Sequence, residues 1–355
     1  MTVQKETSAF GASAPEAFEQ LTAPPATDRE SAVQRSIDGL RIWGSPEFAD
    51  EALAQAHDGA LLALGGERLA FTTDSFVVNP LFFPGGDIGS LSVYGTANDL
   101  AMCGAEPLFL SCGFILEEGF EVAALRRVVR SMRQAASSCG ARIVTGDTKV
   151  VERGKGDGLY VNTSGVGRVV SPALICPSEV HPGDAVILSG DVGAHAAAIL
   201  SVREGLRFET ALLSDCAALW PQVRSLIEAD VEIHCLRDLT RGGLATALNE
   251  IAQTAQLGVF IHEEKVPVQP EVQGACEMMG MDPLYMACEG RFIAFVPQKD
   301  AEKALACLRR AVPDQSPIRI GLVTSDAPGQ VRMVGRLGVE RLLDMLAGEQ
   351  LPRIC

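Results

Sequence analysis

Residues 68–78 read RLAFTTDSFVV, and their β-branched and aromatic side chains predict a strand. The run PGGD at residues 84–87 then breaks the chain, and either Asp87 or the glycines before it can cap a following helix. We expect that helix over residues 88–100, where small side chains allow another segment of backbone to come close. A strand followed at once by a helix is the first sign of a fold that mixes the two elements.

The rest of the first half continues with the same two kinds of element. Strands are predicted at residues 107–114, 142–144 and 159–166. The apolar residues of 122–139 recur at spacings of three and four, which predicts an amphipathic helix that Gly140 ends. Three prolines between residues 171 and 183 indicate a linker between two domains.

The second half begins with the apolar run AVIL at residues 185–188, which is typical of a buried strand. Helices are predicted over residues 193–204, 211–228, 242–255, 270–280 and 299–311. Strands are predicted over residues 258–262, 291–296, 317–323 and 330–334. This alternation indicates an α/β (α+β) fold, with mixed sheets and flanking helices in both halves.

A chain of 355 residues is long enough for two domains, which we place at residues 46–175 and 176–345. A helix is expected around residues 46–63. Residues 1–45 are irregular and are expected to be partly disordered. Residues 346–355 have neither a helical nor a strand period, so we expect a flexible tail that ends in the thiol of Cys355. By itself, a terminal cysteine favours the plainer interpretation of a small hydrophobic residue at a chain end.

Charge and cysteine content disfavour several classes of function. A net charge of −15 at pH 7 argues against nucleic acid and anionic membranes as partners, because a protein of that sign repels both. The ten cysteines include no CxxC pair, so we expect reduced core residues and no zinc site. The sequence shows neither a signal peptide nor a run of roughly 18 apolar residues, which predicts a cytoplasmic protein.

Four aspartates have unusual surroundings. Asp74 interrupts an apolar strand, Asp99 lies in the small-residue helix, Asp147 follows a strand in a glycine-containing turn, and Asp238 precedes a helix. A buried carboxylate is costly unless charges or hydrogen bonds compensate. If the four converge, they suit Mg²⁺, which takes carboxylate oxygens together with phosphate. Asp238 could instead be a helix cap and Asp147 a turn residue, and no Walker A pattern is present to decide.

Two further residues are candidates for chemistry. Lys149 closely follows Asp147, and its alternative interpretation is an ordinary surface lysine. Glu289 lies between two apolar segments, where a carboxyl group has a raised pKa and can act as a base near neutral pH. The alternative for Glu289 is an acid at the start of a strand that pairs with Arg291.

Several separate motifs resemble one family, in the right order. They are SFVVNPLFFPGGDIG at residues 75–89, GTAND at 95–99, LSCGFILEEG at 110–119, TGDTKVV at 145–151, DLTRGG at 238–243 and PRIC at 352–355. Together they resemble the hydrogenase maturation factor HypE family, the carbamoyl dehydratases, over about residues 66–355.

The resemblance implies a fold and a site. The fold is that of the aminoimidazole ribonucleotide synthetase (PurM-like) superfamily, with two α/β domains per chain, a homodimer, and ATP bound by the N-terminal domain. By the same resemblance Asn98 belongs to the nucleotide site, Lys149 and Glu289 act in dehydration, and Cys355 is the modified residue. The implied ligands of Mg²⁺ and phosphate are Asp74, Asp99, Asp147 and Asp238.

The activity that the resemblance implies is ATP-dependent dehydration of a carbamoyl group on the Cys355 thiol to a thiocyanate, which supplies the cyanide ligand for the iron of nickel–iron hydrogenase. The implied partners are the carbamoyltransferase HypF as donor and the iron-carrying HypC–HypD complex as acceptor. Two alternatives stay open: another ATP-dependent kinase or synthetase of the superfamily, and a maturation scaffold without catalysis. A selenophosphate synthetase needs a reactive cysteine near its N-terminus, and here no cysteine precedes Cys103.

Two positions depart from the family pattern. The His-Gly-Ser/Ala-Gly-Gly loop that approaches the nucleotide near the N-terminus is absent, and FGASA at residues 10–14 is at best a degraded counterpart. This difference bears on how the site closes over the nucleotide. Ser90 also stands where a lysine often stands, which is a smaller change.

Overall fold

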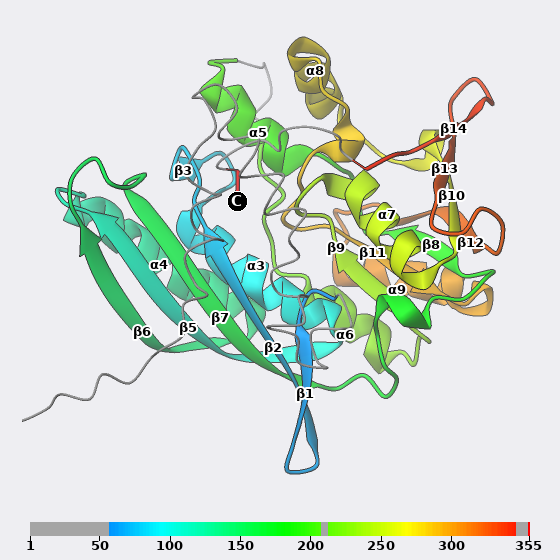
Figure 1. The fold of residues 1–355 in the computed structure, drawn as a ribbon, viewed down its shortest axis with the longest axis horizontal. Coiled ribbons are helices and arrows are strands. Elements are labelled where there is room, and N and C mark those ends of the chain that lie inside the picture. The colour runs from blue at the N-terminus through cyan, green and yellow to red at the C-terminus, as the bar shows by residue number, and fades with distance from the viewer. Residues whose placement is uncertain (1–56, 207–211, 346–353) are drawn as a thin grey trace, which may run out of the picture. The chain divides into compact units, whose positions relative to one another are not determined.

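The computed structural model describes residues 57–206, 212–345 and 354–355. All of these residues belong to one compact unit, Asp50–Cys355, in which helices flank a five-stranded and a seven-stranded sheet (Figure 1). The expected α/β fold with mixed sheets is thereby confirmed. The boundaries of the two predicted domains stay a prediction. Residues 1–45 and most of the tail, which would mark the outer boundaries, lie outside the described residues.

The five-stranded sheet has the order β1-β2-β7-β5-β6, in which only the β5–β6 pair is parallel. Its strands are β1 (Ala60–Leu64), β2 (Glu67–Phe76), β5 (Ala105–Glu117), β6 (Arg142–Val151) and β7 (Leu159–Val169). A short ribbon of β3 (Phe82–Phe83) and β4 (Gly86–Asp87) leads into the first helix.

Helices α3 (Ile88–Met102) and α4 (Val122–Cys139) cover one face of this sheet (Figure 1). Asp87 caps α3 as predicted, because its side chain accepts hydrogen bonds from the backbone N–H groups of Gly89 and Ser90. The side-chain oxygen of Ser90 in turn accepts a hydrogen bond from the backbone N–H of Asp87, and the two contacts together form a capping box. The serine that replaces the usual lysine therefore stabilises the start of α3.

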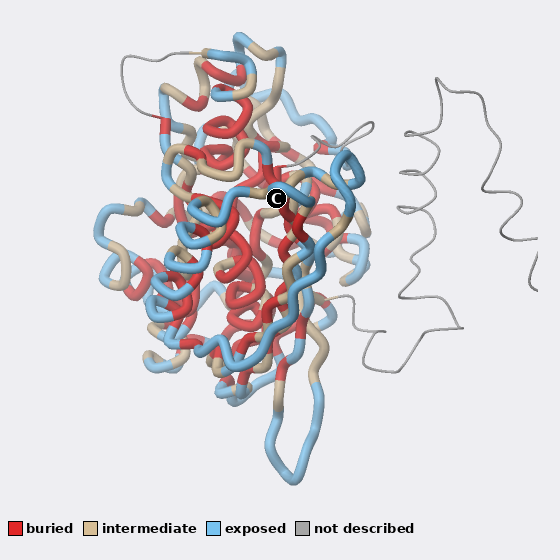
Figure 2. The backbone as a smooth tube through the Cα atoms, turned by 90° about the vertical axis from the view of Figure 1, so that its left-hand side faces the viewer, coloured by how far each residue is buried: buried red, intermediate tan, exposed pale blue. Residues whose placement is uncertain are grey.

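No helix of the described residues covers the other face of the sheet, which we call the open face. Phe71, Phe109 and Ile115 lie on it with 40%, 44% and 43% of their surface exposed. The edge strand β6 is exposed along nearly its whole length (Figure 2).

The seven-stranded sheet has the order β14-β13-β10-β12-β8-β11-β9 and is covered on both faces. Along β8, Val186 and Leu188 pack on one face and Ala185 and Ile187 on the other. The strands are β8 (Ala185–Leu188), β9 (Cys235–Asp238), β10 (Gly258–His262), β11 (Phe292–Val296), β12 (Ile318–Thr324), β13 (Val331–Val334) and β14 (Glu340–Leu342). The helices are α5 (Ala194–Arg203), α6 (Trp220–Glu228), α7 (Gly243–Ala255), α8 (Pro270–Met279) and α9 (Ala301–Ala311). Within the described ranges, every helix is too short or too polar to cross a bilayer.

Three predicted elements are corrected. In place of the end of a helix over 46–63, residues 60–64 form β1, because the turn at Gly65 and Gly66, both with positive φ, folds this apolar run back onto β2. The helix predicted over 211–228 begins only at Trp220, where Pro221 suits a first turn. The strand predicted at 142–144 continues to Val151, so Asp147 lies within a strand and not in a turn.

Candidate active site

An acid cluster forms where the two sheets approach each other. We use this name for Asp58, Asp74, Asp99 and Asp238. Carboxylate oxygens of Asp58, Asp99 and Asp238 all lie within 4.8 Å of one another. Asp58 lies two residues before β1, Asp99 lies near the end of α3, and Asp238 ends β9. Strand and helix ends from distant parts of the sequence therefore deliver hard oxygen ligands to one point.

Asp74 joins the cluster from β2 through a hydrogen bond between its side chain and that of Asp99. Two carboxyl groups in such contact share a proton, since two carboxylates would repel each other. Thr72 lies two residues before Asp74 on β2. Its hydroxyl group is within hydrogen-bond distance of Oδ2 of Asp99, at 2.8 Å, and of the carbonyl oxygen of Asp58, at 3.1 Å. Three of the four predicted aspartates are thus brought together.

The acid cluster has more negative charge than its surroundings balance. Burial, followed by the neighbouring carboxylates, raises the pKa of Asp99 well above its ordinary value, and burial raises that of Asp238 to about 6. Arg237 lies with its Nη1 2.8 Å from Oδ1 of Asp58, but it also pairs with Glu250 at 2.6 Å. Arg241 is a second cation that lowers the pKa of Asp74 and Asp238, yet both pKa values stay above the ordinary value. The buried Oδ2 of Asp58 has no hydrogen-bond partner among the described residues. A divalent cation would fit this donor set, because it supplies the missing positive charge and takes the free oxygen.

Sequence reasoning missed Asp58. The residue stands directly before Gly59 and the apolar run of β1, and the sequence pattern predicts that run as the end of a helix over residues 46–63. The available signal was the pair Gly65 and Gly66, which predicts a tight turn between two strands and so places Asp58 at a strand end beside β2.

Glu289 lies just before β11 with only 3% of its surface exposed. Burial, and then the charges of Asp238 and Asp215, raise its pKa well above the ordinary value. Its backbone N–H donates to Oδ1 of Asp215 at 3.0 Å, and its Oε1 has no hydrogen-bond partner in the described part of the chain. The alternative pairing with Arg291 is wrong, because that guanidinium pairs with Asp191 at 2.6 Å.

Asn98 supports the site through its backbone neighbours. Its Nδ2 donates to the carbonyl oxygens of Ala217 at 3.0 Å and Glu289 at 3.3 Å, and its Oδ1 accepts from the N–H of Leu219 at 2.8 Å. The side chain is almost fully buried. Asn98 therefore holds the segment around Glu289 in place instead of presenting its amide to open space.

The end of the tail lies at the same place. Ile354 is 3% exposed and packs into the core cluster that contains α3 and α5, and Cys355 packs against it as a half-buried residue. Burial, and then the charge of Glu289, raise the pKa of the Cys355 thiol to about 12, and Asp74 and Asp238 act in the same direction. Residues 346–353, the rest of the predicted flexible tail, lie outside the described residues.

Asp147 and Lys149 are not brought to the acid cluster within this chain. On β6 they pair in register with Gly113 and Ile115 of β5, and Ile115 faces the open side of the sheet. Asp74, by contrast, lies in register with the buried Thr163 on the side of α3. Neighbouring residues across a sheet point to the same face, so the two groups lie on opposite faces.

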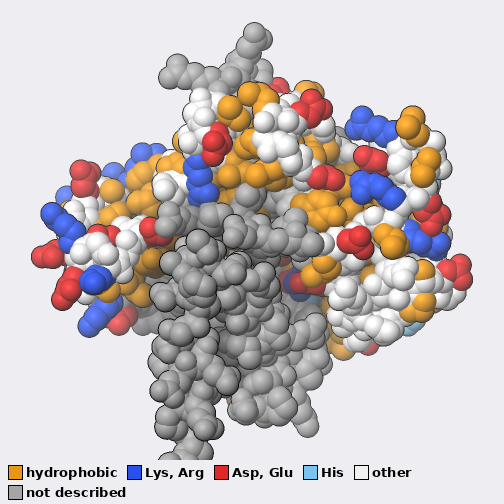
Figure 3. Space-filling model, turned by 45° about the horizontal axis from the view of Figure 1, so that its top comes forward, with side chains coloured by type: hydrophobic (Ala, Val, Ile, Leu, Met, Phe, Trp, Pro, Cys, Tyr) orange, Lys and Arg blue, Asp and Glu red, His pale blue; other side chains and the backbone are white. Residues whose placement is uncertain are grey.

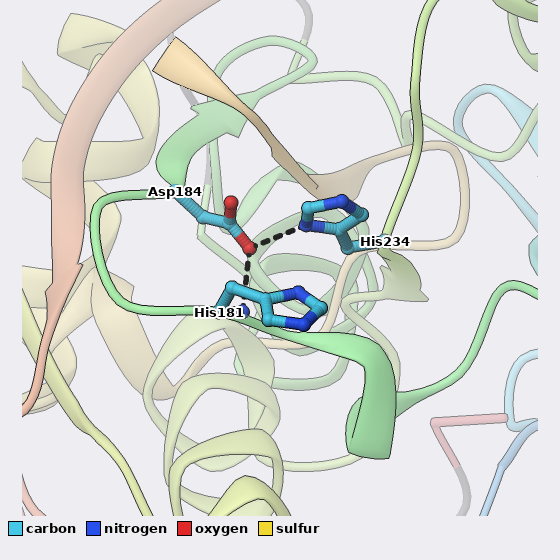
Figure 4. Close-up of side chains that lie close together, drawn as sticks. All are labelled: His181, Asp184 and His234. Carbon is cyan, nitrogen blue, oxygen red and sulfur yellow. Dashed lines mark hydrogen bonds and ion pairs between the residues drawn. The ribbon is translucent and has the colours of Figure 1, made fainter.

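A second group of possible ligands, His181, Asp184 and His234, has a structural explanation (Figure 4). Oδ2 of Asp184 accepts hydrogen bonds from the backbone N–H of His181 and from Nδ1 of His234, both at 2.8 Å. These bonds fix the turn before β8 to the start of β9. Asp238 lies at the other end of β9, about 13 Å away at the usual rise of about 3.3 Å per residue, so this group is separate from the acid cluster.

Hydrophobic side chains form patches among charged side chains on the described part of the face shown in Figure 3. A surface hollow of about 300 Å³ between α5 and α8 is lined by Leu200, Glu204, Leu206, Met278, Met279 and Met281. Among the described residues, its lining offers one carboxylate and no nucleophile.

Comparison with known proteins gives one consistent result. The family models "AIR synthase related protein, N-terminal domain" and "C-terminal domain" match residues 56–169 and 181–333. The carbamoyl dehydratase HypE of Rhodobacter capsulatus is 53% identical over 314 residues, which cover 88% of this chain and 92% of that protein.

Two solved structures are similar over nearly the same length. A hydrogenase maturation protein HypE in complex with ATP has a TM-score of 0.79 and 47% identity, and the match covers 91% of this chain and 97% of that one. A HypE–HypF complex gives a TM-score of 0.82 and 41% identity, with 88% and 100% covered.

Proposed function

Because the chain belongs to the AIR synthase-related family and, within it, to the carbamoyl dehydratases HypE, we propose that it is an ATP-dependent carbamoyl dehydratase of hydrogenase maturation. It converts a carbamoyl group on the thiol of Cys355 into a thiocyanate, the source of the cyanide ligand of the hydrogenase iron. The observation that carries the proposal is the position of Cys355, whose thiol lies among the charges of Glu289, Asp74 and Asp238.

The reaction removes water from a primary amide. The γ-phosphoryl group of ATP is transferred to the carbonyl oxygen of the thiocarbamate, S–C(=O)–NH₂, so that this oxygen becomes part of a phosphate leaving group. Both N–H protons are lost and the C–O bond breaks, which gives S–C≡N, ADP and inorganic phosphate. Most of the catalysis is therefore positioning and the stabilisation of charge.

We assign Mg²⁺ to the acid cluster, where Asp58, Asp99 and Asp238 would hold it and Asp74 would adjoin it. The close carboxylate oxygens, the unpaired Oδ2 of Asp58 and the raised pKa values support this assignment. When bound, the ion neutralises the charge of the transferred phosphate. Asp58 takes the place in this set that the sequence assigned to Asp147.

Glu289 is the proposed base for an N–H proton of the carbamoyl group. Its free oxygen, Oε1, is buried and has no hydrogen-bond partner among the described residues, which leaves it available to the substrate. Its pKa is raised in part by Asp238. Positive charge at the acid cluster offsets that repulsion and lowers the pKa of Glu289 toward the range in which a carboxylate accepts protons.

Asp147 and Lys149 fit the proposal through a second copy of the chain. The apolar open face of the five-stranded sheet supports a homodimer, since large hydrophobic residues such as Phe109 and Ile115 are exposed on it. We propose that the two faces meet and that Asp147 and Lys149 act at a site that both copies form. There Lys149 would steady the phosphate or the developing oxyanion.

The proposed partners follow from the chemistry. HypF is the carbamoyl donor, which a solved complex of HypE with HypF supports. The iron-carrying HypC–HypD complex is the acceptor of cyanide. A cytoplasmic location suits the ten cysteines, all of them described and all free.

The test follows the mass of the chain after incubation with HypF, its carbamoyl donor and ATP. We expect the intact chain to gain a carbamoyl group and then to lose one water, with both changes on the C-terminal peptide. Cys355→Ala removes both changes, whereas Cys307→Ala, in α9 and remote from the tail, retains them. Formation of thiocyanate on the Cys355→Ala chain would show that the acceptor is misassigned.

Glu289→Gln separates the base from the acceptor. This variant gains the carbamoyl group normally, but loss of water slows by roughly 10²- to 10⁴-fold, the usual contribution of a general base. Glu264→Gln is the matched control, because Glu264 is exposed. An unchanged rate of water loss in Glu289→Gln would remove Glu289 from this role. A chain that binds HypF but never turns over ATP would instead be a scaffold.

A further inference from the structure

His195, the second residue of α5, is fully buried and has no part in the proposed dehydration mechanism. Its ring packs edge-on against Phe83, with 5.5 Å between the ring centroids. Burial lowers its pKa to about 4, so the imidazole is neutral at physiological pH. A neutral histidine has one N–H donor and one acceptor, and both have identified partners here.

The hydrogen-bond partners fix the tautomer of His195. Nε2 lies 2.9 Å from the carbonyl oxygen of Ile354, and a carbonyl only accepts, so Nε2 carries the hydrogen. Nδ1 then accepts from the hydroxyl of Ser214, whose Oγ lies 2.8 Å away. That Oγ accepts in turn from the N–H of Cys216 at 3.1 Å. The chain of hydrogen bonds runs in one direction and ends on the tail.

The segment that carries Ser214 also holds the proposed base. Oδ1 of Asp215 accepts the N–H of Glu289 at 3.0 Å, and the carbonyl oxygen of Ala217 accepts from Asn98 at 3.0 Å. The N–H of Ser214 donates to the carbonyl oxygen of Pro84 at 2.9 Å. Residues 214–217 therefore set the position of Glu289 and, through His195, that of the tail.

We propose that His195 and Ser214 form a tail dock, which binds the backbone carbonyl of residue 354 and so places the Cys355 thiol beside Glu289 and the acid cluster. The inference rests on the proposed function, since it concerns where the carbamoylated thiol sits during dehydration. His195 is a positioning residue, because it touches the backbone of Ile354 and not the reacting atoms. One neutral hydrogen bond, together with the buried side chain of Ile354, allows the tail to bind and to leave.

The dock predicts the accessibility of the thiol in the free, full-length protein. Removing one partner of a buried hydrogen bond costs enough to raise the undocked fraction about tenfold, so alkylation of Cys355 by iodoacetamide in His195→Leu is expected to be about tenfold faster than in the unaltered chain. His195→Gln, whose amide can donate to the same carbonyl, is expected to restore most of the protection. Cys307 serves as an internal control within each chain, because it is buried in a core cluster that does not include Ile354 or Cys355.

Ser214→Ala is the second variant, in case a buried leucine at 195 prevents folding. It removes the donor to Nδ1 and frees the tautomer, so a smaller increase, about threefold, is expected at Cys355 alone. Equal alkylation of Cys355 in the folded variants and the unaltered chain would overturn the dock. This readout needs neither ATP nor carbamoyl donor. Loss of the dock is thus distinguished from failure of the proposed function, in which the unaltered chain protects Cys355 but forms no thiocyanate.

A kinetic readout completes the experiment. With Cys355 already carbamoylated, His195→Leu is expected to slow the loss of water about tenfold while the KM for ATP stays unchanged, because the dock orients the tail and not the nucleotide. A raised KM for ATP with an unchanged rate of water loss would contradict a positioning role.

Discussion

At the scale of the residue, the site is a balance between carboxylates that repel each other and a structure that holds them together. Asp99 and Asp74 share a hydrogen bond, Asp58 has one cationic neighbour, and Asp238 is buried beside them. Buried polar groups that lack partners are costly to a fold and are usually kept for function. A cation bound at the acid cluster, as proposed above, would offset this cost.

The pH dependence of stability measures that destabilisation. The pKa of Asp238 is about 6 in the folded chain against the ordinary value of 3.8 for an aspartate, so the folded chain binds this proton more tightly than the unfolded chain. The stability that the carboxyl contributes is therefore present below pH 3.8 and is lost as the pH rises through 6, an effect of about 3 kcal/mol at about 1.36 kcal/mol per pKa unit.

We expect the free energy of unfolding without divalent cations to fall between pH 4 and 7 less steeply in Asp238→Asn than in the unaltered chain. Denaturant unfolding at a series of pH values in a chelator measures this. Added Mg²⁺ is expected to restore stability at pH 7 in the unaltered chain and not in the variant. The exposed Asp314 provides the control substitution, Asp314→Asn. Identical slopes for the unaltered and Asp238→Asn chains would count against this account.

Much of the site was readable from single residues. Asp74, Asp99, Asp238, Glu289 and Cys355 were predicted from polar residues in apolar surroundings and from resemblance, and the structure brings them together. Asp58 and His195 were not, because their roles depend on contacts across large sequence separations. His195 in particular reads as one more residue of an alanine-rich helix, and only the position of Ile354 reveals its partner.

At the scale of the element, close packing of α3 explains how the cluster is assembled. A Cβ on Gly95 would lie 2.7 Å from the ring of Phe76 in β2, and one on Gly89 would lie 2.4 Å from the backbone carbonyl oxygen of Val128 in α4. Real Cβ atoms do not come so close. These small residues therefore let α3 approach both neighbours, which carries Asp99 to Asp74.

Gly89→Ala tests this packing. We expect the free energy of unfolding to fall by about 1–3 kcal/mol, because the carbonyl group of Val128 is part of a helix and cannot move aside cheaply. Gly274→Ala is the matched control: a Cβ there meets nothing within 4 Å, so the substitution should stabilise α8 by up to about 1 kcal/mol. Denaturant unfolding compares the free energies of unfolding of the two variants. Equal changes of the same sign would show that α3 is not tightly packed against α4 at Gly89.

The elements that sequence predicted poorly are those whose limits depend on tertiary contacts. Helix α4 and the buried strand β8 were placed correctly from periodicity alone. The start of α6 was not, because residues 212–219 are held out of a helix by contacts such as that of Asn98 with Ala217 and Leu219. The length of β6 was missed because its pairing with β5 overrides the glycine at position 146.

At the scale of the whole molecule, the open face of the five-stranded sheet is the feature that bears most on how two copies of the chain would assemble. It carries Phe71, Phe109 and Ile115 on one side of the strands, while the opposite side packs on α3 and α4. Both Asp147 and Lys149 belong to this face. A second copy that covers it would remove apolar surface from water and bring further polar groups toward a site.

A substitution on this face tests the homodimer. We expect Ile115→Glu to shift the chain from dimer to monomer, because each copy would have to bury a carboxylate in the interface. Sedimentation equilibrium gives the mass in solution. Leu337→Glu is the control, since Leu337 is 94% exposed and lies in the turn between β13 and β14 of the seven-stranded sheet. A dimer that persists in Ile115→Glu would place the interface elsewhere.

The fixed tautomer of His195 makes the ring a spectroscopic reporter. Of the five histidines in the chain, this one has a buried Nε2–H that is bonded to the tail and an Nδ1 that accepts. In nitrogen-15 NMR, its ring proton should exchange slowly with solvent while Ile354 is in place and quickly once the tail has left. The intensity of one imidazole signal then counts the fraction of molecules whose cysteine is ready to react, and its loss times the departure of the finished thiocyanate.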